Sequence, residues 1–421
     1  MNIAVIGAGY VGLVQAAGLT SLGHRVRVGE ADAGKLETLR AGKVPFYESG
    51  LEQLLSDGLA SGLLSFHHDN LEAVVDARVV FIALPTPQDE DGSADTSYIE
   101  GALLDFGASL GHRTLVVLKS TVPVGSVARF QKQLDDMGAE VVVLSNPEFL
   151  REGSAVGDFK HPDRIVVGTR DQQAAETMIE LYQGLQAPTI VTDPASSEMI
   201  KYASNAYLAA RITYANAIAN LCEAVGADVK DVLKGMGYDR RIGFHFLNPG
   251  PGYGGSCFPK DTQALVAIAE SAGYDFSLLK GVIEVNRQQH ERMLDKVTGM
   301  LGGDVDGKRV AMWGLAFKAG TDDLRDSPAM YLATALKDRG AFVTAYDPQA
   351  SSTEVKQVES AVEAARDAHL LLIATEWPEF QGIDMREVHG VMASANIVDA
   401  RNMLDPRDMH RLQFNYVGVG R

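Results

Sequence analysis

Two stretches of the chain carry residue types and spacings that could do chemistry. The first, Gly7-Ala8-Gly9-Tyr10-Val11-Gly12, is a G-x-G-x-x-G pattern between an apolar run at 2–6 and a helical pattern. Its glycines permit a tight turn and the close approach of a pyrophosphate, while the helix start offers free N–H groups. Glu30 follows a second predicted strand at 24–29, where a carboxylate can bind a ribose hydroxyl and repel a 2′-phosphate. The pattern predicts a dinucleotide site that prefers NAD to NADP.

The second stretch is a loop rich in glycine and proline, 248–256, which ends at Cys257. Lys260 follows closely, and positive charge near a thiol favours the nucleophilic thiolate. The other cysteine, Cys222, lies inside a helical pattern and is interpreted as a buried structural thiol. The residue types alone leave Cys257 open to either role, nucleophile or structural thiol.

The residues around these stretches alternate between strand and helix patterns up to about residue 193, which predicts a mostly parallel sheet covered on both faces. Further apolar runs typical of buried strands lie at 78–84, 114–118, 140–144 and 164–168. The segment 196–225 contains no Gly or Pro and predicts one long helix, which could also be a dimer surface.

A second α/β region follows Gly302-Gly303, and its first turn, GLAFKAG, lacks the three-glycine fingerprint. We predict a helix from Pro328 to about Asp338, and the expected strands lie at about 308–314, 342–346, 370–374, 396–400 and 416–420. The expected fold is α/β, with two Rossmann-like doubly wound domains joined by a long central helix. The predicted domains are 1–195, 196–300 and 301–421.

Composition excludes several classes of protein. The chain has 421 residues, of which 46% are hydrophobic, and a net charge of −17, which disfavours a nucleic-acid partner. Two cysteines cannot form a disulfide framework or a Cys-only zinc site, so no metal is expected and a reducing cytoplasm is the default compartment. No apolar run reaches the roughly 18 residues of a membrane helix, and the N-terminus reads as a strand, not as a signal peptide.

The whole chain resembles the nucleotide-sugar dehydrogenases, a family that oxidises a sugar C6 alcohol to a carboxylate. The resemblance rests on segments in the same order: GAGYVGL, ALPTPQDEDGSADTSYI, KSTVPVGS, SNPEFLREG, EMIKYASNAYLA, RRIGFHFLNPGPGYGGSCFPKD, GLAFKAGTDDLRDSP and VDARNMLDP. The loop GYGGSCF resembles the branch that converts UDP-glucose to UDP-glucuronate, and a GDP-mannose enzyme remains the alternative. Branches acting on N-acetylhexosamines tend to carry a His in that loop, where this chain has Ser256.

The resemblance implies a two-step oxidation by two molecules of NAD through a covalent intermediate on Cys257, first a thiohemiacetal and then a thioester. Lys201 and Asn205 would stabilise the oxyanion at C6, and Asp261, with Lys201, would handle the alcohol proton. Glu148 would be the base for thioester hydrolysis, and Thr121 would hold the water. Asp261 could also be the N-cap of a helix beginning at Thr262.

The remaining site residues are also implied by the resemblance. Cofactor binding is expected at Gly7, Gly9, Tyr10, Val11, Gly12, Glu30, Lys35, Pro85, Thr86, Thr121 and Glu152. Substrate binding is expected at Glu148, Phe149, Leu150, Lys201, Asn205, Arg241, Phe246, Tyr253, Gly254, Lys260, Phe317, Lys318, Arg325 and Arg401. The family usually has Asp where this chain has Glu30. The resemblance also implies a nucleotide-sugar site in the C-terminal domain and a homodimer, in which Arg241 can reach the other subunit.

Three other readings make distinct predictions. A short-chain epimerase or dehydratase needs Tyr-x-x-x-Lys, and no tyrosine here has Lys four residues later. A simple hydroxy-acid dehydrogenase would not need Cys257 and would survive its replacement by Ala. An NAD-binding sensor without turnover would bind NAD and form no NADH from a sugar.

Overall fold

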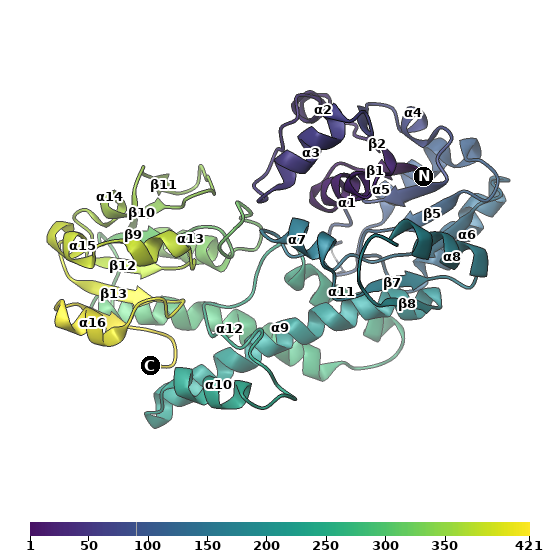
Figure 1. Cartoon of the computed structure of the whole chain (residues 1–421). Coiled ribbons are helices and arrows are strands. Elements are labelled where there is room, and N and C mark those ends of the chain that lie inside the picture. Colours follow the sequence, from purple (N-terminus) through teal and green to yellow (C-terminus); the bar gives the residue numbers. More distant parts are fainter. Residues whose placement is uncertain (90) are drawn as a thin grey trace. The chain divides into compact units, whose positions relative to one another are not determined.

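The computed structural model describes residues 1–89 and 91–421, and its contacts divide the chain into two compact units. The first unit contains residues 1–204 and 267–274, and the second contains 205–266 and 275–421. Each unit is built on its own sheet (Figure 1).

In the described residues, the first unit holds an eight-stranded sheet in the order β3-β2-β1-β4-β5-β6-β7-β8. The strands are β1 Asn2–Ile6, β2 Arg25–Gly29, β3 Leu64–His67, β4 Val79–Ile82, β5 Leu115–Leu118, β6 Val142–Ser145, β7 Ile165–Gly168 and β8 Thr189–Thr192. All neighbours pair in parallel except β6 and β7, which meet antiparallel through Ser145 and Gly168. The chain order reverses between β1 and β4, which makes the carboxyl end of β1 the expected ligand crevice.

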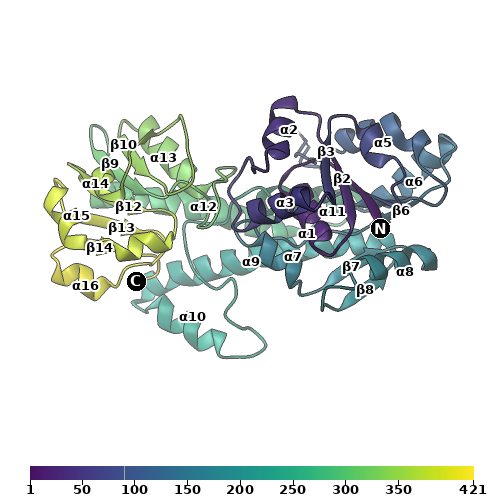
Figure 2. The ribbon, with the colours of Figure 1, turned by 45° about the horizontal axis from the view of Figure 1, so that its top comes forward.

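Helices cover both faces of this sheet. Successive strand residues point to opposite sides, and because both sets are apolar, each face needs a layer of helices to bury it. Ile3 and Val5 belong to one apolar core, and Ala4 and Ile6 to the other. The first face is covered by α1 Tyr10–Ser21, α2 Ala33–Arg40, α3 Leu51–Ala60, α7 Ala155–Lys160 and α8 Gln172–Leu181. The second face is covered by α4 Asn70–Val74, α5 Ser97–Phe106 and α6 Ser126–Asp136, and Figure 2 shows α5 and α6 beside the sheet.

The second unit repeats this plan with six parallel strands in the order β11-β10-β9-β12-β13-β14 within the described residues. The strands are β9 Arg309–Trp313, β10 Phe342–Tyr346, β11 Lys356–Gln357, β12 Leu370–Ile373, β13 Asn396–Asp399 and β14 Asn415–Val417. One face packs on α10 Val229–Gly237, α12 Ser277–Met300, α13 Pro328–Asp338 and part of α9 Pro194–Val225. The other face packs on α14 Ala361–Ala365, α15 Met385–Val391 and α16 Pro406–Arg411.

Two helices run through the boundary between the units. The first is α9, Pro194–Val225, and the second is α11, Phe258–Ser271. The predicted α/β class, the two doubly wound sheets and the long helix are therefore confirmed. Among the helices in the described part of the chain, none has the length and hydrophobicity needed to cross a bilayer.

Three short strands were not anticipated, namely β3, β8 and β11. All three lie at sheet edges, where a strand has only one neighbour to pair with, and the residues of β8 are only partly covered. A strand of this kind carries a weak hydrophobic pattern, so periodicity misses it.

Candidate active site

The glycine loop at the end of β1 has the geometry of a phosphate cradle. A Cβ on Gly12 would lie 1.9 Å from the Gly7 carbonyl oxygen, so only glycine allows α1 to pack this closely on the strand. Gly7 has φ +96°, and a Cβ there would lie 2.7 Å from the Ala83 oxygen. A Cβ on Gly9 would meet nothing within 4 Å, which leaves open space where the backbone can approach a pyrophosphate. The loop therefore fits the phosphates of a dinucleotide.

Glu30 lies immediately after β2 and faces the start of α2. Its carboxylate accepts a hydrogen bond from the Asp32 N–H at 3.0 Å and pairs with Lys35 Nζ at 2.7 Å. This places the predicted acid, together with Lys35, where a ribose is held in such folds. The longer side chain found here in place of Asp is thus held in a defined position.

The first turn of α1 is tied to the segment after β6. The Tyr10 hydroxyl donates to Glu48, and both groups accept a backbone hydrogen bond from Gly153 N–H. Burial, the Glu48 charge and the Glu152 charge together raise the pKa of Tyr10, so Tyr10 stays a neutral donor. Val11 follows it in the same helix turn.

The loops after β4 and β5 meet through a second pair of predicted residues. The Thr86 hydroxyl, two residues after Leu84 and next to Pro85, donates to the Thr121 carbonyl oxygen at 2.9 Å. Glu198 on α9 holds the far end of the Thr121 loop, because its carboxylate accepts hydrogen bonds from Gly125 N–H at 2.6 Å and Val127 N–H at 2.8 Å. The structure thus brings Thr86 and Thr121 together and reveals Glu198, which sequence reasoning missed.

A buried ion pair joins the segment after β6 to α9. Lys201 Nζ lies 2.7 Å from Glu148 Oε1, and the two side chains are 4% and 6% exposed. Glu148 Oε2 accepts from Leu150 N–H at 2.6 Å, and Lys201 Nζ also lies 5.6 Å from the centre of the Phe149 ring. Burial by itself raises the pKa of Glu148, but the charges of Lys201 and Lys119 and these hydrogen bonds hold it below its ordinary value. Glu148 is therefore a carboxylate rather than an acid at neutral pH.

A second buried polar cluster lies in the other unit. Asn205 Nδ2 donates to Asp261 Oδ2 at 2.6 Å, and Lys260 Nζ donates to Asp261 Oδ1 at 2.7 Å. Asp261 is 1% exposed, so both of its oxygens are used inside the protein. Three of the predicted catalytic and substrate residues are thereby in direct contact.

Cys257 lies immediately before α11. The helix begins at Phe258, and the Asp261 N–H donates to the Cys257 carbonyl oxygen at 2.8 Å, which closes the first helical turn. Asp261 is therefore inside this first turn, and the expectation that it caps a helix beginning at Thr262 is wrong. The helix begins four residues earlier than expected, and its first turn includes Pro259, because Pro is well tolerated in a first turn. Cys257 is therefore the residue directly before the first turn of α11.

The loop that carries Cys257 is fixed by residues that no motif indicated. Asn286 on α12 accepts from Tyr253 N–H at 2.8 Å and donates to the Tyr253 carbonyl at 3.1 Å. A Cβ on Gly254 would lie 2.0 Å from the Asp326 carbonyl oxygen, and one on Gly255 would lie 2.7 Å from the Phe317 ring. The glycines are therefore required by close packing against the segment after β9, and Tyr253 itself is buried.

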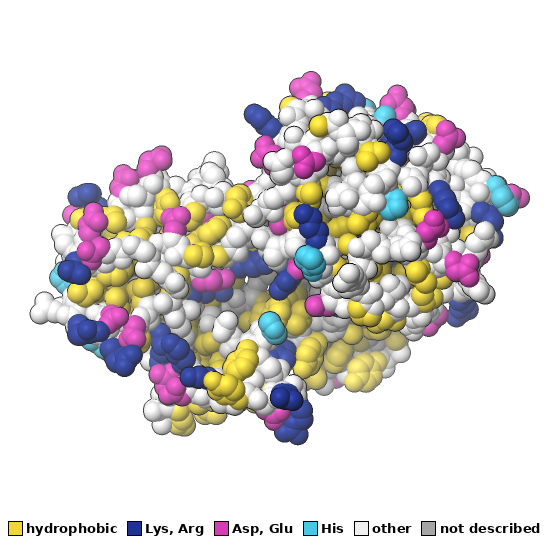
Figure 3. Space-filling model, viewed as in Figure 1, with side chains coloured by type: hydrophobic (Ala, Val, Ile, Leu, Met, Phe, Trp, Pro, Cys, Tyr) yellow, Lys and Arg dark blue, Asp and Glu magenta, His cyan; other side chains and the backbone are white. Residues whose placement is uncertain are grey.

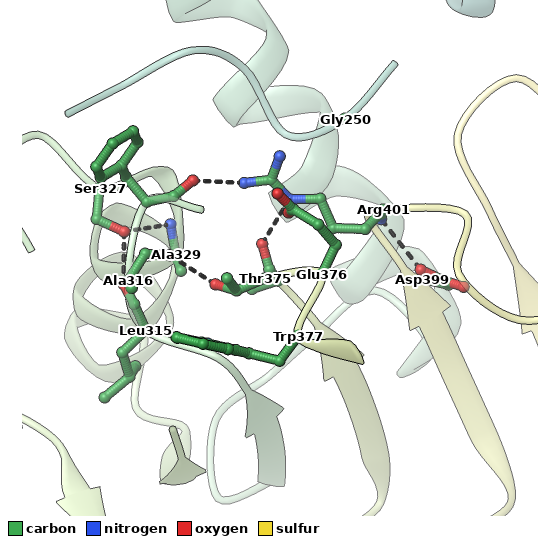
Figure 4. Close-up of polar contacts among 12 residues, drawn as sticks. Gly250, Leu315, Ala316, Ser327, Ala329, Thr375, Glu376, Trp377, Asp399 and Arg401 are labelled. Carbon is green, nitrogen blue, oxygen red and sulfur yellow. Dashed lines mark hydrogen bonds and ion pairs between the residues drawn. The ribbon is translucent and has the colours of Figure 1, made fainter. Parts of the chain in front are cut away.

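Arg401, directly beyond β13, fastens that same segment (Figure 4). Its guanidinium donates to the carbonyls of Phe317 at 2.7 Å and Ala374 at 2.9 Å and pairs with Glu376 at 3.0 Å. A Cβ on Gly250 would lie 3.4 Å from the same guanidinium. Arg401 thus ties the segments after β9 and β12 together and lies close to Gly250 in the cysteine loop.

The remaining predicted substrate residues lie nearer the surface. Arg241 pairs with Asp239 at 2.6 Å and Arg325 with Asp323 at 2.7 Å, and their side chains are 88% and 65% exposed. Lys318 Nζ lies 5.6 Å from the centre of the neighbouring Phe317 ring. Phe246 packs its ring 6.2 Å from that of Phe258 at the start of α11. In the described residues, no group of three or more His, Cys, Asp or Glu side chains is arranged to hold a metal.

The first unit thus combines a dinucleotide loop beyond β1 with a buried ion pair between a carboxylate beyond β6 and an ammonium on α9. That combination is typical of an NAD-dependent dehydrogenase, whose parallel sheet binds the cofactor at the carboxyl ends of its strands.

Sequence comparison identifies the family of dehydrogenases to which the chain belongs. Residues 1–186 match the NAD binding domain of the UDP-glucose/GDP-mannose dehydrogenase family, residues 195–288 its central domain and residues 311–406 its UDP binding domain. The chain belongs to this family. Its N-terminal domain binds NAD, and its C-terminal domain is the family's UDP-binding domain.

Several relatives match over the full length. The chain is 45% identical to a UDP-glucose 6-dehydrogenase of Rhizobium meliloti, with 100% of both chains covered. It is 42% identical to one of Pseudomonas aeruginosa, with 100% of this chain and 98% of the other covered. A UDP-glucose dehydrogenase structure from Pyrobaculum islandicum superimposes with a TM-score of 0.92 at 39% identity, covering 99% of this chain and 97% of that one.

Proposed function

We propose that this enzyme oxidises UDP-glucose at C6 to UDP-glucuronate in two steps that consume two NAD. The observation that carries the proposal is the full-length similarity to UDP-glucose 6-dehydrogenases at 45% and 42% identity. The polar clusters described above supply every side-chain type that this chemistry requires. NAD, when bound, accepts the hydride in each oxidation.

In the first oxidation, the C6 alcohol loses a proton and a hydride and becomes an aldehyde. Lys201 and Asn205, four residues apart on α9, are proposed to hold the C6 oxygen, and Asp261 accepts the proton. Asp261 suits this role because its oxygens are already organised by Asn205 and Lys260.

In the second oxidation, the Cys257 thiolate attacks the aldehyde. The Sγ–C6 bond forms as the C=O π bond opens, which gives a thiohemiacetal whose C6 oxygen carries the negative charge. Loss of a second hydride from C6 converts the thiohemiacetal into a thioester, so the aldehyde never leaves the enzyme. Water then attacks C6, Glu148 takes a proton from that water, and the C6–Sγ bond breaks to return the thiolate. Thr121 is proposed to hold the attacking water, and the carboxylate state of Glu148 favours its role as base.

Binding of the two ligands is proposed for the remaining residues, in a chain divided into segments 1–195, 196–300 and 301–421. For NAD, we propose Gly7, Gly9, Tyr10, Val11, Gly12, Glu30, Lys35, Pro85, Thr86, Thr121 and Glu152. For the nucleotide sugar, we propose Glu148, Phe149, Leu150, Arg241, Phe246, Tyr253, Gly254, Lys260, Phe317, Lys318, Arg325 and Arg401. Arg401 would act partly through Phe317, whose carbonyl it holds.

We also propose that the enzyme is a cytoplasmic homodimer that uses α9 as part of its interface. Tyr207, Tyr214 and Leu221 recur every seven residues on this helix and are 63%, 53% and 57% exposed. Figure 3 shows apolar side chains exposed over α9 and α10. A stripe of large apolar side chains of this kind marks an interaction surface. Light scattering should give twice the chain mass of 45.2 kDa, and Tyr214→Glu should lower that mass.

The decisive experiment measures NADH formed per sugar consumed, with UDP-glucose and NAD in one tube and GDP-mannose and NAD in another. Two NADH per UDP-glucose is the expected result. One NADH per sugar would contradict the roles of Cys257 and Glu148, and turnover with GDP-mannose alone would contradict the substrate. No NADH from either sugar would favour an NAD-binding protein without turnover.

The two cysteines supply a matched pair of variants. Cys257→Ala should lower UDP-glucuronate formation by about 10³-fold or more, because the covalent intermediate is lost. Cys222→Ala should keep the wild-type rate, since that thiol belongs to α9 and is buried in the apolar core of the second unit. Equal activity of both variants would instead fit a simple hydroxyl dehydrogenase that needs no thiol.

A further inference from the structure

Lys119 is a buried ammonium that the proposed mechanism does not use. It directly follows β5, is 7% exposed, and its Nζ donates a hydrogen bond to Asn146 Oδ1 at 3.1 Å. Asn146 directly follows β6 and is itself 1% exposed. The amide is fixed from two further sides, since it accepts from the Tyr182 hydroxyl at 2.8 Å and donates to the Val166 carbonyl at 2.7 Å. The ammonium is therefore held in one place by a rigid neutral partner.

The titratable groups that face Lys119 come from three elements. Glu148 lies beyond β6, Lys201 lies on α9, and Tyr182, after α8, has its ring centre 5.9 Å from Nζ. Burial lowers the pKa of Lys119 to about 8, although the negative charge of Glu148 opposes that change. Lys119 and Lys201 are thus two cations beside one carboxylate, and Lys201 makes the direct ion pair.

Such an arrangement is unfavourable for stability alone. A buried ammonium whose hydrogen-bond acceptor is a neutral amide loses hydration that the amide does not replace. A methionine would fill the same elongated space without that loss, and Asn146 would still be bonded by Tyr182. The feature that makes Lys119 useful is its charge, which acts on Glu148 from a fixed position.

We propose that Lys119 is a positioning residue for thioester hydrolysis, whose charge keeps Glu148 ionised while Lys201 engages the oxygen on C6. This inference rests on the proposed function. With only Lys201 as a counter-charge, the buried carboxylate would take up a proton when Lys201 turns to the substrate, and it could then accept none from water. Lys119 makes no bond to the substrate in this scheme, and it transfers no proton.

The test is the pH profile of Lys119→Met, with Lys132→Met as the control. Lys132 is an exposed lysine on α6 in the same unit. At pH 6, we expect kcat of K119M to be roughly tenfold below wild type, with KM values for UDP-glucose and NAD within about twofold. The ratio of the wild-type kcat to the K119M kcat should approach one above about pH 8, where wild-type Lys119 has itself lost its charge. K132M should follow wild type throughout.

A stability measurement separates this role from a structural one. K119M should melt at or above the wild-type temperature at pH 7, because a desolvated charge has been removed. Between about pH 8 and 10.5, the unfolded chain binds the Lys119 proton and the folded one does not, so wild type should gain stability relative to K119M.

A lower melting temperature with a kcat ratio that is independent of pH would mean that Lys119 is structural, and it would overturn the proposal. A ratio near one at every pH would overturn it as well. If wild type forms no NADH from UDP-glucose, the proposed function fails and takes this inference with it. If wild type turns over UDP-glucose and K119M has the same kcat at every pH, the Lys119 proposal fails and the proposed function stands.

Discussion

Lys201 on α9 and Glu148 beyond β6 form an ion pair of 2.7 Å that is almost completely shielded from solvent. The two charges stabilise each other inside the protein, so removing one raises the free-energy cost of burying the other. The pair therefore links the stability of the first unit to the chemistry proposed for it.

Lys201→Met is expected to abolish turnover and to destabilise the protein by about 3 kcal/mol, since the buried Glu148 carboxylate loses its direct ion-pair partner. The pKa of Glu148 should rise, so the lost stability should be partly regained as the pH falls and Glu148 is protonated. Urea unfolding at pH 5 and pH 8 measures this. The double variant Lys201→Met/Glu148→Gln should recover stability without recovering activity, and failure to recover stability would mean that the pair is not the source of the loss.

The glycine loop predicts opposite effects for two similar substitutions. Gly9→Ala should leave the melting temperature unchanged, because Gly9 has φ −69° and a Cβ there meets no atom within 4 Å. Its methyl group would occupy the space of the pyrophosphate, so KM for NAD should rise about tenfold or more. Gly12→Ala should instead destabilise the fold, since its Cβ would lie 1.9 Å from the Gly7 oxygen. Thermal melts measure the stability of both variants, and NAD titrations measure their KM for NAD. Equal effects of the two variants on both quantities would contradict the prediction.

Glu198 offers a test of how the Thr121 loop is held. Glu198→Ala removes the acceptor for two backbone N–H groups at the start of α6 and should cost about 2 kcal/mol together with a clear loss of kcat. Asp171→Ala is the matched control, because Asp171 caps α8 by accepting from Ala174 N–H at 2.8 Å. The control should lose stability and keep its kcat. A normal kcat for Glu198→Ala would show that the loop does not need this anchor.

His290 on α12 should make the second unit sensitive to acid. Its Nε2 is buried without a hydrogen-bond partner among the described residues, its ring packs on Tyr331, and a Cβ on Gly252 would touch it. Burial lowers the pKa of His290 to about 4, although Glu291 opposes the change. Between about pH 6.5 and 4, the unfolded chain is protonated at this position and the folded chain is not, so stability falls as the pH falls.

His290→Leu should remove this acid sensitivity. Urea unfolding of the variant and of wild type at pH 7.5 and pH 4.5 measures this effect. Between the two pH values, the free energy of unfolding of His290→Leu should rise relative to that of wild type by at most about 3 kcal/mol at the lower pH. His112→Gln is the control, because His112 is an exposed histidine paired with Glu140 and should give no such gain. If the difference in stability between His290→Leu and wild type is the same at both pH values, His290 is already charged in the folded protein.

Local patterns in the sequence determined most of the architecture. Buried strands such as 79–82 and 115–118 are continuous apolar runs, and the glycine loop lies directly after another such run, β1 at 2–6. These features depend on neighbours a few residues apart, so periodicity and turn chemistry predict them. The cysteine loop and the site residues also followed from the sequence, but through a resemblance to a family.

Only the tertiary structure decided which side chains meet. Asn205 and Asp261 are 56 residues apart in the chain, and Glu148 and Lys201 are 53 apart. Lys119 and Asn146 have ordinary surroundings in the sequence, and they become partners because β5 and β6 are neighbours in the sheet. Hydrogen bonding and desolvation are set by distance in space, which the order of residues along the chain does not contain.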